Sequence, residues 1–209
     1  MRLAILGASG HGKVVADAAA LAGWDEVMFF DDAWPQLAKN GPWLIAGNTE
    51  ALLQGLREFD GVVVAIGNNR IRQLKRNELT VAGARLVSVV HPSAVVSKHA
   101  LVGVGSVVFA NAVINACAKL GRGCIVNTGA VVEHDCVLGD FAHVSPNAVM
   151  AGGVKVGPLA WVGACASIRQ LIEVGEGAVV GMGAVVTKNV PPGVTVVGNP
   201  AKVLKPRKD

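Results

Sequence analysis

The stretch VVEHDCVLGDFAHVSP, residues 131–146, places an aliphatic side chain at every sixth residue. The spacing extends in both directions: from Val90 to Val186 there are seventeen such positions, and sixteen of them are Val, Ile or Leu. A second column, four residues later in each unit, is mostly Ala and includes Cys124 and Cys136. One aliphatic and one small inward residue per hexapeptide is the signature of a parallel β-helix, so these two cysteines are expected to be packing residues.

Three hexapeptides make one triangular coil, and a Val-Gly or Leu-Gly pair returns once per coil, at positions 102, 120, 138, 156 and 174. Seventeen units predict five to six coils, or a prism roughly 25 to 30 Å long at ~4.8 Å per strand layer. Because the register does not slip, we expect no large loop within the prism.

The composition agrees with a globular chain, since 52% of the 209 residues are hydrophobic and only 16% are charged. The net charge of +4 depends on Lys202, Lys205, Arg207 and Lys208, so the body is close to neutral and nucleic-acid binding is not expected. No apolar run approaches the ~18 residues of a transmembrane helix. The N-terminal stretch is also too short and glycine-rich for a signal peptide, so we expect a cytoplasmic protein with no membrane span.

Residues 1–85 have a different pattern, in which short apolar runs alternate with helical patterns. This predicts a Rossmann-like sheet of parallel strands with helical crossovers, followed by a β-helix domain with a C-terminal tail over residues 86–209. Ligands of such a sheet bind at the carboxyl ends of its strands. The expected strands are 2–6, 26–30 and 61–67, and the expected helices are 13–23, 49–56 and 70–83.

A glycine loop, GASGHG at residues 7–12, joins the first expected strand to the first helix. Glycines there allow close approach of a ligand, and the helix N-terminus presents free N–H groups to an anion. The order G-x-x-G-x-G differs from the dinucleotide fingerprint G-x-G-x-x-G. Asp31 and Asp32 follow the second strand, where an acid can bind a ribose or a base edge. A simple turn remains open as an alternative, whereas a redox cofactor is disfavoured because the chain lacks other residues suited to hydride chemistry.

Four pieces of the sequence together resemble the bacterial sugar acetyltransferases, typified by sialic acid O-acetyltransferases and by nucleotide-aminosugar N-acetyltransferases of the bacillosamine and perosamine pathways. The resemblance covers nearly the whole chain. It implies a left-handed β-helix, a homotrimer, acetyl-coenzyme A as donor, and N-acetylation of a UDP- or GDP-linked aminosugar. The matching pieces are GASGHGKVVAD, EHDC, HVSPNA and GVTVVGNPAKVLK.

The resemblance also implies roles for individual residues. It places acetyl-coenzyme A at His143 and near the backbone of Ala164 and Met182, although Met182 replaces the small residue expected there. It places the nucleotide of the substrate in the first domain, at Ser9, Gly10, His11, Asp31, Asp32 and the loop Gly67, Asn68 and Asn69.

His134 lies outside both inward columns, so it is not a core residue. Acetyl transfer to an amine needs a base near neutral pKa, which a histidine supplies. The resemblance gives His134 that role and Asp135 the supporting one, with Glu133 as the local competitor. His143 follows nine residues later, half a coil away, so the two histidines face different sides of one prism. We therefore expect them to share a cleft only across a subunit interface.

Other interpretations remain open at this point. Some hexapeptide prisms bind zinc through three histidines, but the spacings of 8, 35 and 9 from His91 through His99 and His134 to His143 do not fit, so no metal is expected. O-acetylation of a sialic acid or related sugar would use the same base. A non-catalytic nucleotide-sugar-binding scaffold is the alternative from another class. The basic tail could pair with coenzyme A phosphates or simply be solvated.

Overall fold

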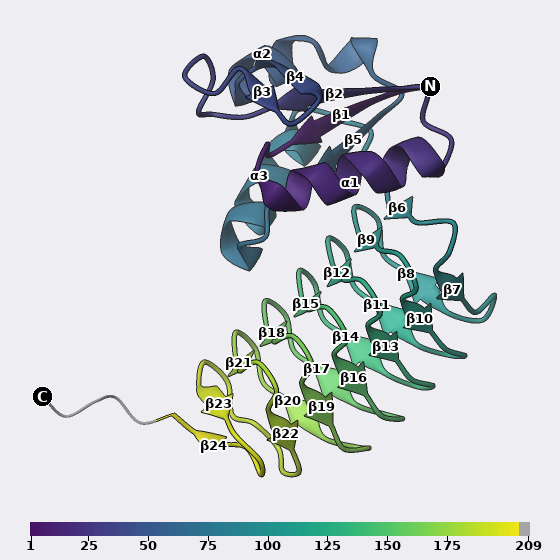
Figure 1. Cartoon of the computed structure of the whole chain (residues 1–209), viewed down its shortest axis with the longest axis vertical. Coiled ribbons are helices and arrows are strands. Elements are labelled where there is room, and N and C mark those ends of the chain that lie inside the picture. The colour runs from purple at the N-terminus through teal and green to yellow at the C-terminus, as the bar shows by residue number, and fades with distance from the viewer. Residues whose placement is uncertain (205–209) are drawn as a thin grey trace, which may run out of the picture.

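The computed structural model describes residues 1–204, in which a helix-flanked sheet is followed by a three-sided coil (Figure 1). The sheet has the order β3-β4-β2-β1-β5, and its strands are parallel except for the edge strand β3. The sequence pattern does not predict β3 and β4, in which Gly41 and Pro42 form the turn between the two strands. The strands are β1 (Arg2–Leu6), β2 (Glu26–Phe30), β3 (Lys39–Asn40), β4 (Trp43–Gly47) and β5 (Gly61–Val64).

Helices cover both faces of this sheet, as the alternation of buried residues in β1 requires. Leu3 and Ile5 pack towards α1, whereas Ala4 and Leu6 pack towards α2 and α3. The helix α1 begins three residues before the expected start, at the glycine loop. The helical elements are α1 (Gly10–Leu21), α2 (Thr49–Gln54), the 3-10 helix η1 (Leu56–Glu58) and α3 (Asn69–Val81).

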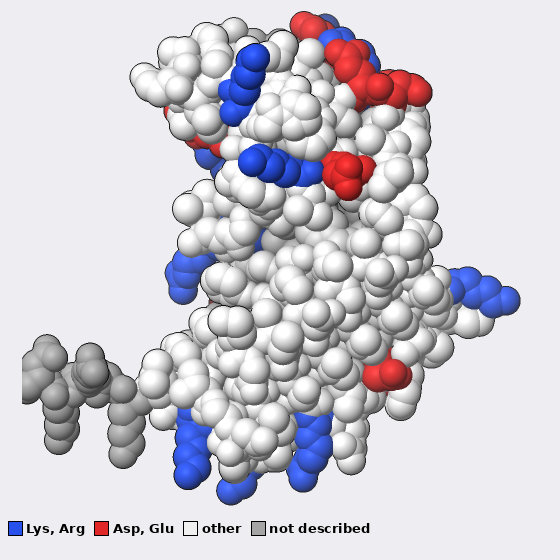
Figure 2. Space-filling view, in the orientation of Figure 1, with Lys and Arg blue, Asp and Glu red and all other residues white. Residues whose placement is uncertain are grey.

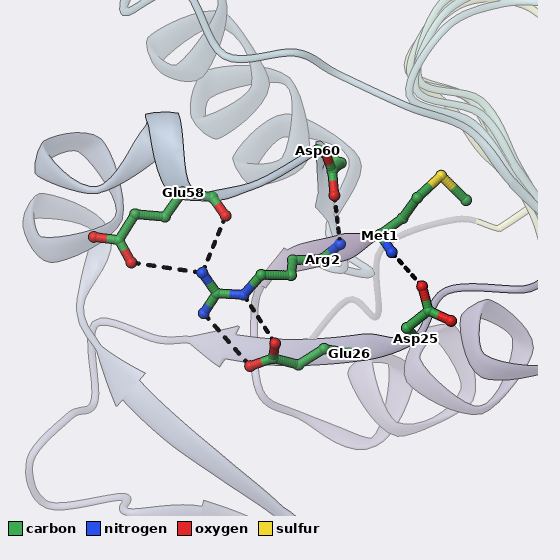
Figure 3. Close-up of polar contacts among 6 residues, drawn as sticks. All are labelled: Met1, Arg2, Asp25, Glu26, Glu58 and Asp60. Atoms are coloured by element: carbon green, nitrogen blue, oxygen red, sulfur yellow. Dashed lines mark hydrogen bonds and ion pairs between the residues drawn. The ribbon is translucent and has the colours of Figure 1, made fainter.

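Charged side chains meet at the amino-terminal edge of the sheet (Figure 3). Arg2 Nε donates to Glu26 at 2.8 Å, its Nη1 donates to the Glu58 carbonyl at 3.2 Å, and its backbone N–H donates to Asp60 at 2.7 Å. Exposed ion pairs of this kind contribute little stability. They tie β1 to β2 and to the start of β5, at the end of the sheet remote from the ligand-binding edge.

The coil is a prism with three sides, on each of which a strand pairs in parallel with the equivalent strand one coil later, as Val113 pairs with Val131. The β13 side consists of β7 (Val95–Val96), β10 (Val113–Ile114), β13 (Val131–Val132), β16 (Val149–Met150), β19 (Ser167–Ile168) and β22 (Val185–Val186). The β14 side consists of β8 (Leu101–Val102), β11 (Lys119–Leu120), β14 (Val137–Leu138), β17 (Lys155–Val156) and β20 (Glu173–Val174). The third side, here called the covered side, consists of β6 (Val89–Val90), β9 (Val107–Val108), β12 (Ile125–Val126), β15 (His143–Val144), β18 (Trp161–Val162), β21 (Val179–Val180), β23 (Thr195–Val197) and β24 (Lys202–Val203).

The two inward columns fill the prism as the repeat predicts, and Cys124 and Cys136 are fully buried in it. A third column turns the corners: non-glycine residues with φ near +60° include Asp135 (60°) and Phe141 (60°). A positive φ is uncommon for residues other than glycine. The left-handed β-helix expected from the sequence is confirmed, and its corners set the backbone around Asp135.

The covered side joins the two parts of the chain. Val89, Val107 and Ile125, which occupy the same position on successive coils, point outward from it and are at most 1% exposed because they pack into the core beneath α1 (Figure 1). The next residue of this outward column is His143, which is 7% exposed, and the one after it is Trp161, at 44%. The α/β part therefore covers the first three coils, and His143 lies where that cover ends.

The last coil is shorter than the others. Val174 pairs with Val190 and Val180 with Val196, so these partners are closer in sequence than the paired residues of the earlier coils. The strand β24 then turns back antiparallel to β23 and closes the end. Of the basic tail, Lys205, Arg207 and Lys208 lie outside the described residues.

Charge is sparse over most of the prism in the view of Figure 2 and gathers on the α/β part and at the far end. Within residues 1–204, none of the helices is long and apolar enough to cross a membrane.

Candidate active site

His134 and Asp135 lie at the corner between β13 and β14. The Nδ1–H of His134 donates to Asp135 Oδ2 at 2.8 Å, and both side chains are about two-thirds exposed, at 64% and 65%. The Glu133 carboxylate instead accepts the backbone N–H of His134, at 3.3 Å. The hydrogen bond to Asp135 raises the pKa of His134 above its ordinary 6.5. In the neutral ring this leaves Nε2 as the proton acceptor.

The His134 ring lies over Gly152, the equivalent residue one coil further on. A Cβ built on Gly152 would lie 2.5 Å from both Cε1 and Nε2 of that ring. The same corner position holds Ala116 and Gln170 on neighbouring coils, so the fold itself accepts a side chain there. The lack of a side chain at Gly152 therefore leaves the space that the imidazole of His134 occupies. The ring opens into a pocket of about 320 Å³ lined by His134, Asp135, Gly152, Gly153, Gln170 and Leu171.

His143 has a contrasting environment on the covered side. Its ring stacks on Trp161, with 5.3 Å between centroids and 8° between planes. Burial, together with the charge of Arg72 and the nearby His11, lowers the pKa of His143 to about 3. The ring is consequently neutral at physiological pH and can offer a hydrogen bond without charge.

A second pocket, of about 380 Å³, opens beside His143. It brings together the three positions at which the family resemblance implies acetyl-coenzyme A contacts, His143, Ala164 and Met182. Trp161 and Ser145 also line it, and Trp161 Nε1 donates to Ser145 Oγ at 2.7 Å. Trp161 was not predicted from the sequence, although it follows His143 by one coil. The lining residues are His143, Ser145, Pro146, Trp161, Gly163, Ala164, Val179, Val180, Gly181 and Met182.

His134 and His143 of one chain line separate pockets. The first lies at the corner between the β13 and β14 sides, and the second lies on the covered side, which is the side opposite that corner. The expectation that they meet across a subunit interface stays a prediction.

The glycine loop follows β1 at the carboxyl edge of the sheet. Gly7 has φ of 113°, and a Cβ there would lie 2.7 Å from the Ala65 carbonyl oxygen, so this turn requires glycine. Ser9 precedes α1, and Ser9 and Gly10 are exposed. His11 instead packs its ring edge-on against Phe109 of the prism, 5.4 Å away between centroids, and burial lowers its pKa to about 4.

The other predicted substrate residues lie at the ends of the neighbouring strands β2 and β5. The Asp31 carboxylate accepts the N–H groups of Ala8, at 2.6 Å, and Ala33, at 2.9 Å. Asp32 accepts the Thr49 N–H and pairs with Lys75 at 2.8 Å. After β5, Asn68 Oδ1 accepts the N–H groups of Arg70 and Ile71, both at 3.1 Å, and so caps α3. Because β2, β1 and β5 are adjacent, the three loops share one edge, as an α/β ligand site requires.

Comparison with known proteins agrees with this architecture over nearly the whole chain. The acetyltransferase domain of PglB from Neisseria gonorrhoeae FA1090 is 43% identical, with a TM-score of 0.92 over 97% of this chain and 99% of that one. The chain belongs to the bacterial sugar acetyltransferase family. The sequence resemblance to that family is thereby confirmed.

Other members of the sugar acetyltransferase family are also similar to this chain. PerB from Caulobacter crescentus, solved in complex with CoA and GDP-perosamine, is 37% identical with a TM-score of 0.91 over 98% of each chain. Residues 2–79 match the PglD N-terminal domain family. UDP-N-acetylbacillosamine N-acetyltransferase of Bacillus subtilis (strain 168) is 36% identical over 107 residues, 50% of this chain. That match spans about half, 49%, of the length of the curated relative.

The placement of the side chains also bears on the alternative that the prism binds zinc through three histidines. Among residues 1–204, three or more His, Cys, Asp or Glu side chains do not gather in any group that could hold a metal ion.

Proposed function

We propose that this protein is an acetyl-coenzyme A-dependent N-acetyltransferase that acts on the amino group of a nucleotide-linked aminosugar. The observation that carries the proposal is the His134–Asp135 pair, a base with a raised pKa that opens into a pocket. Two relatives support the choice of substrates. The PglB domain has been solved in complex with acetyl coenzyme A, and PerB with CoA and GDP-perosamine.

The reaction needs one proton acceptor. The amine nitrogen attacks the thioester carbonyl carbon and sheds a proton to Nε2 of His134, while Asp135 stabilises the imidazolium that forms. Backbone donors of the prism stabilise the tetrahedral oxyanion. The C–S bond then breaks, the amide remains, and the proton on His134 is available to the departing coenzyme A thiolate.

Direct transfer is favoured over an acetyl intermediate on either of the two buried cysteines. Cys124 and Cys136 are buried, and burial raises the pKa of Cys124 to about 12 and also raises that of Cys136. The thiolate that a nucleophile requires is therefore strongly disfavoured at both residues.

We further propose that the active unit is a cytoplasmic homotrimer. The outward column of the β13 side is an apolar stripe in which Val95 is 63% and Val149 38% exposed. Aliphatic stripes of this kind mark protein interfaces, and a second copy of the chain is the proposed occupant. Packing on this side would bring the His134 corner, at its edge, towards the covered side of a neighbour and hence towards its His143 pocket. The stripe consists of Val95, Val113, Val131, Val149, Ser167 and Val185.

The test is an acetyl transfer assay with acetyl-coenzyme A and a panel of UDP- and GDP-linked 4-aminosugars, in which released thiol is measured. Turnover with at least one amine is expected, and His134→Ala should lower kcat by about 10² to 10⁴-fold. His99→Ala, an exposed histidine on the same prism, is the matched control and should retain activity.

Other outcomes of this assay contradict the proposal. Transfer to sialic acid hydroxyls alone would assign O-acetylation, and nucleotide-sugar binding without any turnover would assign a scaffold. His143→Ala should raise the KM for acetyl-coenzyme A, and an unchanged KM would contradict the assignment of the second pocket.

A further inference from the structure

Arg72 on α3 is charged yet only 1% exposed, and it lies between the α/β part and the prism. All five N–H groups of its guanidinium have acceptors, which is the full capacity of the group. On the prism, Nε donates to the Gly123 carbonyl at 2.8 Å and Nη2 to the Phe141 carbonyl at 2.7 Å. Within the α/β part, Nη1 donates to the carbonyls of Ile66, at 2.9 Å, and Gly67, at 3.1 Å, and Nη2 to Asn69 Oδ1 at 2.9 Å.

The prism acceptors form a regular column. Gly123, Phe141 and Leu159 follow one another at intervals of one coil and occupy the same left-handed corner on three successive coils. Asn69 Nδ2 donates to the third of these carbonyls, Leu159, at 2.9 Å. The first turn of α3 is therefore fixed to three coils at once.

A guanidinium suits this role better than an apolar side chain. Burial lowers the pKa of Arg72 to about 10, so the charge persists at neutral pH and its hydrogen bonds are charge-assisted. An apolar residue would hold two surfaces together but would allow them to slide, whereas the planar fork accepts only one arrangement of carbonyls. A lysine, with three donors on a single nitrogen, cannot reproduce it.

The two sets of acceptors lie next to the two proposed substrate sites, one for the nucleotide and one for acetyl-coenzyme A. Ile66 directly precedes the loop in which the nucleotide is expected, and Gly67 is the first residue of that loop. Phe141 lies two residues before His143, in the coil that leads to the acetyl-coenzyme A pocket. A single side chain thus spans from the nucleotide loop to the acetyl site.

We propose that Arg72 is a positioning residue that sets the distance between the bound nucleotide and the acetyl group. It contacts neither substrate. Through Gly67 and Phe141 it holds the two binding sites in one register, so that binding of the nucleotide delivers the acceptor amine to the thioester. The inference rests on the proposed function, because it assigns the nucleotide to one part and acetyl-coenzyme A to the other.

The test compares Arg72→Met with Arg76→Met. Arg76 lies one turn further along α3, near Arg122 and Asp140 of the prism, so its replacement removes a charge from the same region. For Arg72→Met, kcat with the nucleotide-linked aminosugar should fall about 100-fold, the cost of a displacement of about 1 Å between reacting groups. The dissociation constant for acetyl-coenzyme A should stay within about twofold, because the residues that line its pocket are unchanged.

A second acceptor separates positioning from general damage. The same aminosugar without its nucleotide does not use the α/β part, so Arg72→Met should leave its slow acetylation unchanged. A merely structural role would lower the rate with both acceptors alike, and that result would overturn the proposal. Unchanged kcat with the nucleotide-linked acceptor would overturn it as well. Arg72→Lys, which keeps the charge, should give an intermediate loss and serves if Arg72→Met does not fold.

Hydrogen exchange supplies a readout that does not depend on turnover. Amides of residues 66–72 should exchange faster in Arg72→Met than in the wild type, while those of β1 remain protected; equal exchange in the two proteins would refute the tether. If the wild type acetylates no nucleotide-aminosugar, the proposed function fails, and this measurement decides the tether separately.

Discussion

Gly152→Ala is a minimal test of how the catalytic base is held. The substitution adds one methyl group beneath the imidazole of His134. The backbone at this position is ordinary, and Ala116 occupies the equivalent corner one coil before His134, so alanine should not disturb the coil itself.

The expected magnitude follows from the geometry. A Cβ at residue 152 would lie 2.5 Å from the ring atoms, whereas ordinary contacts begin at 3.4 Å. The ring must therefore move by about 1 Å, and a displacement of that size costs about 100-fold in rate, or about 2.7 kcal/mol of transition-state stabilisation. The same movement lengthens the hydrogen bond to Asp135 that raises the pKa of His134.

Two measurements check this prediction. Steady-state assays should show kcat reduced about 100-fold with little change in the KM for acetyl-coenzyme A. NMR titration of the His134 ring should show its pKa falling back towards 6.5. Ala116→Ser, which enlarges a side chain at the same corner one coil away, is the control and should behave as the wild type. A Gly152→Ala enzyme with wild-type kcat would refute the account of how His134 is seated.

Asp135→Asn removes the carboxylate that raises the pKa of His134, so the midpoint of the pH–rate profile should move down towards 6.5 as the plateau falls; an unmoved midpoint would contradict the pairing. Burial lowers the pKa of His11 to about 4 and of His143 to about 3, so the unfolded chain binds more protons than the folded one below pH 6.5. The free energy of unfolding should therefore decrease as the pH is lowered below 6.5. Each histidine should cost about 2 kcal/mol at pH 5 in urea unfolding, and His143→Phe should flatten the slope, whereas an equal slope would count against a buried neutral ring. Val149→Glu should dissociate the proposed trimer in light scattering and abolish turnover; a stable trimer would exclude this stripe as its interface.

Sequence periodicity predicted most of the prism, because each coil repeats the same two inward positions and the same backbone ladder. A side chain that departs from these columns, as His134 does, must then face outward. The same period relates the residues of the two pockets, because Gly152 follows His134, and Trp161 follows His143, by one coil.

Other features came only from tertiary structure. The repeat does not distinguish one outward position from another. The α/β part does so, because it buries Val107 in its core and ends beside His143, so that His143 and the more exposed Trp161 line a pocket. Likewise, nothing in the sequence distinguishes Arg72 from an ordinary charge on a helix.

The physical reason for this division is the range of the interactions. The repeat is encoded by contacts one coil away, identical from unit to unit, so residue type and spacing by themselves determined the prism, its columns and the outward placement of His134. The junction of the two parts depends on single contacts between residues 51 to 91 positions apart, such as Arg72 to Gly123 and Asn69 to Ala160. No spacing in the sequence encodes these contacts, and only the packed structure decided them.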